Sequence, residues 1–77
     1  MNLNLETGPE GRFPKSFEWH GVRQVVISIG RHRIVDDELF MLIMANEDNI
    51  FELAFHRLEQ TWRVHRTPRD FGKRRFV

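Results

Sequence analysis

The sequence predicts an all-β domain in which five antiparallel strands form a meander that curls into a small barrel. Three observations predict this fold. β-Branched and aromatic residues alternate with polar residues over short runs. Residues that favour turns separate these runs. The chain has 77 residues, 40% of them hydrophobic, which suits one small domain with a packed core.

Five runs have the composition of strands. The expected strands are Ser16–His20, Val22–Arg33, Leu39–Ala45, Ile50–Arg57 and Trp62–Arg66. A helix over Asp37–Met44 is the main alternative to the third strand, because Leu, Met and Glu favour helices. We favour the strand because Leu39–Met44 is apolar on every side, whereas a surface helix has one apolar stripe.

Turn lengths predict how these strands pair. Four-residue turns at 34–37, 46–49 and 58–61 give the closing pairs Arg33 with Glu38, Ala45 with Ile50, and Arg57 with Trp62. The three registers agree on a single core face. Its members are Phe17, Trp19, Val25, Ile27, Ile29, Phe40, Leu42, Met44, Phe51, Leu53, Phe55, Trp62 and Val64.

The first hairpin fits this pattern less well. A two-residue turn at His20-Gly21 gives the second strand the wrong parity for its apolar residues Ile27 and Ile29. Either the loop has three residues, with Gly21 at positive φ, or the strand has a bulge near Val25. Both features bend the sheet, which favours closure into an SH3-like barrel.

The sequence predicts flexible arms at both ends of the chain, on either side of a domain at residues 16–67. Residues 1–15 contain two prolines and two glycines and show little periodicity. The segment Pro68–Val77 is basic and contains Phe71 and Phe76.

The predicted registers leave a second apolar face on the side away from the core. An exposed patch of this size is unusual for a soluble monomer. Either an arm covers it, through residues such as Leu3 and Leu5, or another chain does. We favour another chain, a second copy in a two-fold dimer. The candidate protein interface is Val26, Leu39, Met41, Ile43, Ile50 and Ala54.

Charge is distributed unevenly along the chain, although the net charge is +1. Residues 36–60 contain one basic and seven acidic groups, net −6, and residues 61–77 contain six basic groups and one acidic group, net +5. A basic end of this kind supports an alternative function, nucleic-acid binding through phosphate contacts. The candidate contacts are Arg63, Arg66, Arg69, Lys73, Arg74 and Arg75.

Several kinds of chemistry are not supported by the residues present. The chain has no cysteine, which excludes disulfides and thiolate metal sites. His56, His65 and Glu52 make only a weak metal site, and no glycine-rich phosphate loop or paired nucleophile and base occurs. We expect no catalytic residue, metal or cofactor, and a non-enzymatic protein-interaction or assembly module.

The expected location is the cytoplasm. No apolar run approaches the ~18 residues that a membrane helix needs, and the first residues lack the features of a secretory signal. We therefore expect no membrane partner.

Three motifs carry a resemblance. Phe17-Glu18-Trp19-His20-Gly21, Phe51-Glu52-Leu53 and Trp62-Arg63-Val64 resemble a family of small uncharacterised bacterial β domains with an F-x-W-x-G start, an F-E-L strand and a final W-x-V strand. The resemblance covers Phe17–Arg66 and implies the fold. Gln24 departs from it, since the family is expected to have an aromatic residue there. The family's association with genes of DNA-repair polymerases implies a repair context but assigns no activity to any residue.

Overall fold

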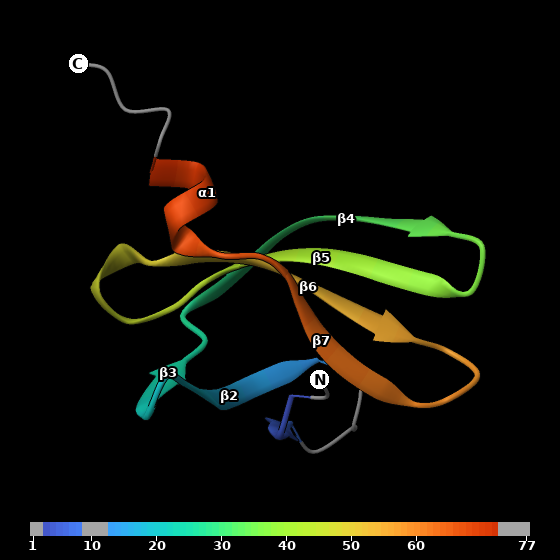
Figure 1. Ribbon diagram of the computed structural model, residues 1–77, viewed down its shortest axis with the longest axis horizontal. Helices are drawn as coiled ribbons and strands as arrows, with labels where there is room; N and C mark the ends of the chain where they lie inside the picture. Colours follow the sequence, from blue (N-terminus) through green and yellow to red (C-terminus); the bar gives the residue numbers. More distant parts are fainter. Residues whose placement is uncertain (1–2, 9–12, 73–77) are drawn as a thin grey trace.

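Over residues 3–8 and 13–72, the part of the chain that the computed structural model describes, seven strands form two antiparallel sheets (Figure 1). The three-stranded sheet has the order β1-β2-β3, with β1 at Leu5–Thr7, β2 at Pro14–Trp19 and β3 at Val22–Val25. The four-stranded sheet has the order β4-β5-β6-β7, with strands at Ser28–Val35, Glu38–Met44, Ile50–His56 and Thr61–Arg66. A short 3₁₀ turn at Asn46–Asp48 joins β5 to β6, and α1 (Pro68–Gly72) follows β7.

The all-β antiparallel class is confirmed, but the closed five-stranded barrel is wrong. The long second strand is divided into β3 and β4 because the chain changes partner between them. The Val26 amide donates to the Lys15 carbonyl of β2 (2.9 Å), whereas the next amide, that of Ile27, donates to the Met44 carbonyl of β5 (2.7 Å). The chain therefore passes from one sheet to the other at this point.

Parts of both expected arms have regular structure. Leu5–Thr7 forms β1 and pairs with β2, and Pro68–Gly72 forms α1. Residues 1–2, 9–12 and 73–77 lie outside the described residues.

The first hairpin has the two-residue turn. Trp19 pairs with Val22, and the two turn residues, His20 and Gly21, both have positive φ (52° and 79°). Glycine adopts this conformation without steric cost, which makes residue 21 well suited to the turn. The parity conflict expected for this hairpin is resolved by the break after Val25, close to the site expected for a bulge.

The register between β5 and β6 differs by one residue from the prediction. Met44, rather than Ala45, pairs with Ile50. The loop between them has an additional residue, and Glu47 and Asp48 take the left-handed conformation within it (φ 59° and 60°). Since side chains alternate along a strand, a one-residue change exchanges the two faces of β5.

The core consequently uses the opposite face of β5. Met41 and Ile43, expected on the second face, are 1% and 2% exposed and pack with Phe51 and Leu53. The expected core residues Phe40, Leu42 and Met44 lie on the other face of the sheet. Three more expected core residues, Val25, Ile27 and Ile29, are exposed. The observed core cluster is Phe17, Met41, Ile43, Ala45, Phe51, Leu53 and Trp62.

Next to their turns, the other two predicted registers are wrong by two residues, a difference that keeps neighbouring strands on the same relative faces. Beyond the irregularities between Ile29 and His32 and between Glu52 and Leu53, the difference is one residue. Phe55 pairs with Trp62, and Val35 pairs with Glu38 across a two-residue turn in which Asp36 has positive φ (55°). Below, the inner face of the four-stranded sheet is the one with Met41, Ile43 and Leu53, which packs on the three-stranded sheet. The outer face is the one with Phe40, Glu52 and Arg63.

Candidate functional site

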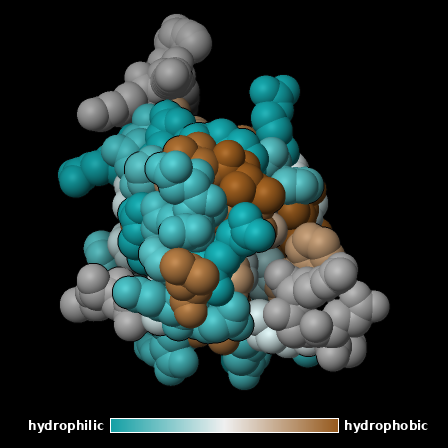
Figure 2. All heavy atoms as spheres, turned by 90° about the vertical axis from the view of Figure 1, so that its right-hand side faces the viewer, coloured by the Kyte–Doolittle hydropathy of each residue, from teal (hydrophilic) through white to brown (hydrophobic). Residues whose placement is uncertain are grey.

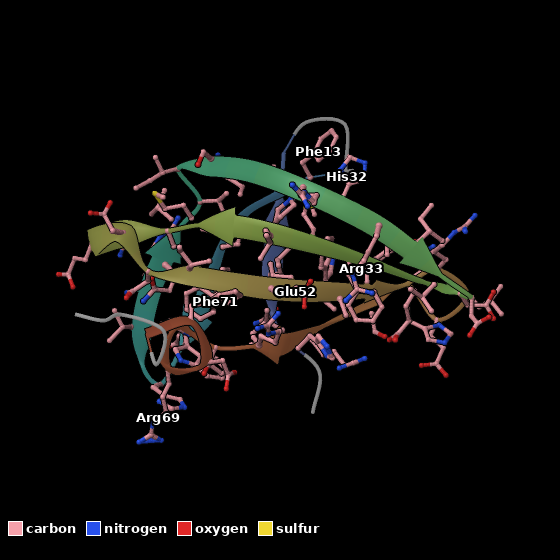
Figure 3. The ribbon with its side chains drawn as sticks, turned by 90° about the horizontal axis from the view of Figure 1, so that it is seen from above. Phe13, His32, Arg33, Glu52, Arg69 and Phe71 are labelled. Atoms are coloured by element: carbon pink, nitrogen blue, oxygen red, sulfur yellow. The ribbon has the colours of Figure 1, made fainter. Side chains whose placement is uncertain are left out.

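A groove with a volume of about 600 Å³ opens beneath β4, on the inner side of the four-stranded sheet. Phe13, which directly precedes β2, lies beside His32 at the outer edge of β4 (Figure 3). Most of the lining is apolar, and the polar contribution comes from His32, Arg57 and Gln60. The lining residues are Phe13, His32, Ile34, Leu39, Met41, Phe55, Arg57, Gln60 and Trp62.

Apolar side chains are also exposed near the open end of the groove. Figure 2 views the end of the molecule with the β4–β5 and β6–β7 turns, and it shows brown apolar patches among hydrophilic residues. The exposed apolar residues of these segments are Ile34, Val35 and Leu58. Of these, Ile34 lines the groove itself.

The edge of β4 is free of a strand partner within the described residues. All eight residues of β4 are exposed, and β4 is the outermost strand of its sheet. An edge of this kind presents unpaired backbone N–H and C=O groups to any extended segment that approaches it.

The backbone groups that point outward can be identified from the hydrogen bonding of the neighbouring strands. The Asp37 carbonyl accepts a hydrogen bond from the Arg57 amide on the β6 side (2.8 Å), so the backbone groups of Glu38, the next residue, face β4. Val35, which pairs with Glu38, therefore directs its backbone N–H and C=O groups toward β5. By alternation, the N–H and C=O groups of His32 and Ile34 point away from β5.

Two other sheet edges are bridged, in contrast to β4. The Leu3 amide donates to the Trp62 carbonyl of β7 (2.8 Å). At β3, the Asn46 side chain accepts from the Val25 amide (2.7 Å) and donates to the Arg23 carbonyl (2.9 Å). Segments from elsewhere in the chain thus satisfy backbone groups at β7 and β3.

The outer face of the four-stranded sheet has a cluster of charged side chains around Phe40. The Arg33 guanidinium lies 4.4 Å from the centroid of the Phe40 ring, and the His65 ring packs edge-on at 4.8 Å. Arg63 donates two hydrogen bonds to Glu38 (2.9 and 3.3 Å). These hydrogen bonds, with the charge of Arg63, lower the pKa of the Glu38 carboxyl, although desolvation opposes the shift.

Glu52 is the buried acid of this cluster. Its carboxylate lies 3.6 Å from the Arg33 guanidinium and 3.7 Å from the His65 imidazole, and Figure 3 shows Glu52 and Arg33 side by side. The sequence grouped His56 with Glu52 and His65 in a weak metal site. In the structure, His56 Nδ1 instead accepts a hydrogen bond from the Glu59 amide (3.1 Å). Among the described residues, no three potential metal ligands come together.

The predicted protein interface does not form a single exposed face. Leu39, Met41 and Ile43 point to the inner side and Ile50 and Ala54 to the outer side. Met41, Ile43 and Ala54 are buried, and Val26 packs against the core. The register change removes the reason for proposing a dimer through these residues, because they divide between the two faces of the sheet and three of the six are buried. Dimerisation itself stays a prediction.

The predicted nucleic-acid contacts have different environments. Arg63 pairs with Glu38, and the Arg66 guanidinium stacks on the Phe71 ring of α1 at 4.7 Å. Arg69 is exposed on α1 and points away from the sheet (Figure 3). Lys73, Arg74 and Arg75 lie outside the described residues.

Sequence reasoning missed the groove. Leu39, Met41, Phe55 and Trp62 were identifiable as apolar strand residues, but Phe13 belonged to the expected arm and Ile34 to an expected turn. The one available signal was the run Arg31–Val35, in which basic residues alternate with His32 and Ile34.

No family model, curated protein or solved structure matches this chain. The resemblance to the small bacterial β domains therefore stays a prediction. In the described part of the chain, no helix has the length and apolar character required to cross a membrane.

Proposed function

We propose that this chain is a non-enzymatic protein-interaction module, which binds a segment of another protein in the groove beneath β4. The observation that carries the proposal is the position of the groove: a mainly apolar cavity opens at the edge of β4, an outermost strand that is exposed along its whole length. Burial of one apolar side chain there contributes ~1.5–3 kcal/mol to binding. The polar residues at its wall, His32, Arg57 and Gln60, suit recognition of a ligand.

A protein ligand is favoured over nucleic acid. Single-stranded nucleic acids bind where successive bases stack on several exposed aromatic rings. Among the described residues, Phe13 is the only exposed phenylalanine or tryptophan (48%), whereas Phe40 and Trp62 are buried. Two of the arginines on the outer face are already engaged, Arg63 by Glu38 and Arg66 by Phe71. Nucleic acid is therefore an outcome of the test rather than the proposal. A cytoplasmic location stays a prediction.

The test compares two matched substitutions, Ile34→Lys and Ile27→Lys. The two isoleucines are 59% and 62% exposed, but only Ile34 lines the groove. Tagged wild-type and variant proteins are used to capture ligands from cell extract, with and without nuclease. Each captured protein is then purified and titrated against all three forms by calorimetry.

The proposal predicts a purified protein ligand that binds directly after nuclease treatment. Ile34→Lys should weaken its binding about tenfold or more, since it places a charge against an apolar surface, and Ile27→Lys should have little effect. Binding that requires nucleic acid, or that is equally sensitive to both substitutions, contradicts the proposal.

A further inference from the structure

The free edge of β4 has a regular pattern from His32 to Val35. His32 and Ile34 direct their backbone groups outward, as derived above, and their side chains line the groove. Arg33, between them, lies over Phe40 on the outer face. An extended segment that hydrogen-bonds to this edge would therefore place alternate side chains in the groove and on the outer face.

The charged residues of β4 itself are basic. Arg31 and Arg33 border a small hollow of the outer face, where Arg33 pairs with the buried Glu52 (3.6 Å), and Arg57 lines the groove. Among the described residues, no carboxylate lies within ion-pair distance of Arg31 or Arg57. β4 contains no acidic residue. A strand beside it gains favourable cross-strand pairs if its outer-face residues are acidic.

We propose that the ligand is an extended acidic segment of another protein, which joins β4 as an added strand. This inference rests on the proposed function. Its apolar residues occupy the groove beside His32 and Ile34, and the alternate residues, which are acidic, face Arg31 and Arg33. The hydrogen bonds to the edge of β4 supply affinity for any extended chain, and the alternating pattern supplies specificity.

A second copy of this chain is a less suitable ligand. An antiparallel pairing of β4 with its own copy, centred on His32, brings Arg31 of one chain opposite Arg33 of the other. Like charges in opposite positions destabilise a sheet. The bulge between Ile29 and His32 further limits regular pairing over the whole strand.

The test uses the complete chain and short capped peptides in which glutamate alternates with valine. A second peptide has the same composition with the glutamates and valines in separate blocks, and a third has lysine in place of glutamate. Binding is measured by fluorescence anisotropy. The alternating acidic peptide should bind at least about tenfold more tightly than either control peptide.

N-methylation of the peptide identifies strand addition directly. In an added strand, only every second amide faces β4. N-methylation of one alternate set of amides should weaken binding about tenfold or more, because backbone hydrogen bonds are lost, whereas N-methylation of the other set should leave it unchanged. Arg31→Glu should weaken binding of the acidic peptide and strengthen binding of the lysine peptide.

The outcomes separate this inference from the proposed function. Equal effects of the two N-methylated sets, or no preference for the alternating acidic peptide up to about 1 mM, overturn strand addition. If an isolated protein ligand still depends on Ile34 in that case, the groove function stands and only its mode of binding is wrong. If sedimentation shows a dimer that Arg31→Glu alters and the acidic peptide dissociates, a second copy is the ligand and the inference fails.

Discussion

The edges of β7 and β4 lie at opposite sides of the same sheet and are treated differently by the rest of the chain. The backbone of β7 receives a hydrogen bond from Leu3, and Trp62 on this strand belongs to the core. β4 is exposed along its whole length and borders a groove. At one side of the sheet the chain itself supplies a hydrogen-bond donor, whereas at the other no described residue pairs with the strand edge.

The difference also shows how an open strand edge can be protected from unwanted pairing with other chains. Exposed strand edges tend to pair with other chains, and charged residues and bulges are the common protection. β4 has both, in the form of its basic residues and the irregularity between Ile29 and His32. These features discourage pairing with an identical chain but leave the edge open to an acidic one.

The largest expected effect compares Trp62→Ala with Ile34→Ala. Trp62 is buried, so its truncation should reduce the free energy of unfolding by ~3–5 kcal/mol. Ile34 is mainly exposed, so its truncation should change it by less than about 0.5 kcal/mol. Urea denaturation measures both values. Similar losses for the two variants would mean that the groove is closed in solution and that Ile34 belongs to the core.

An intermediate effect is expected at the bridged edge of β3. Asn46→Ala removes the side chain that bonds to Val25 and Arg23, and should cost ~1–3 kcal/mol in the free energy of unfolding. Asn49→Ala, in the same loop, is the control. None of the described hydrogen bonds involves its side chain, so we expect little change in denaturation. A small effect at Asn46 would show that the bridge contributes nothing to stability.

The smallest effect is expected at Glu38 and depends on pH. Since Arg63 lowers the pKa of Glu38 below its ordinary value of 4.5, the pair stabilises the folded state above that pH. The stabilisation is lost as the pH falls through the lower pKa of the folded state. Glu38→Gln should therefore be less stable than wild type near neutral pH, and the difference should vanish in acid.

Denaturation over a pH series, with Arg63→Gln and the double variant, tests this pair. Arg63→Gln should remove the same pH dependence, and the double variant should add little to either single change. A stability difference between wild type and Glu38→Gln that persists unchanged in acid contradicts the assignment.

The sequence was sufficient to predict the antiparallel all-β class and most of the strands. It predicted β5, β6 and β7 within two residues at each end, because alternation and turn residues are local signals. The helix alternative for Asp37–Met44 was correctly rejected. The core positions predicted for Phe51, Leu53 and Trp62 are confirmed, because β6 and β7 keep their predicted faces.

The local sequence pattern did not determine the length of the loop between β5 and β6. The segment Asn46–Asn49 is compatible with more than one turn, and Glu47 and Asp48 adopt left-handed φ values that non-glycine residues take infrequently. A loop longer by one residue moved Met41 and Ile43 from the supposed interface into the core. The groove depends on how the two sheets pack, which involves residues far apart in the chain, such as Phe13 and Ile34.

Amide hydrogen exchange along β4 of the free protein tests the central claim most directly. The open edge predicts an alternating pattern, in which the amides of Arg33 and Val35 are protected by β5 and those of His32 and Ile34 exchange almost as fast as unstructured amides. Exchange is followed residue by residue by NMR in dilute solution. Equal protection of all four amides would show that another segment or chain already pairs with β4, and would contradict the claim that this edge is available to a ligand.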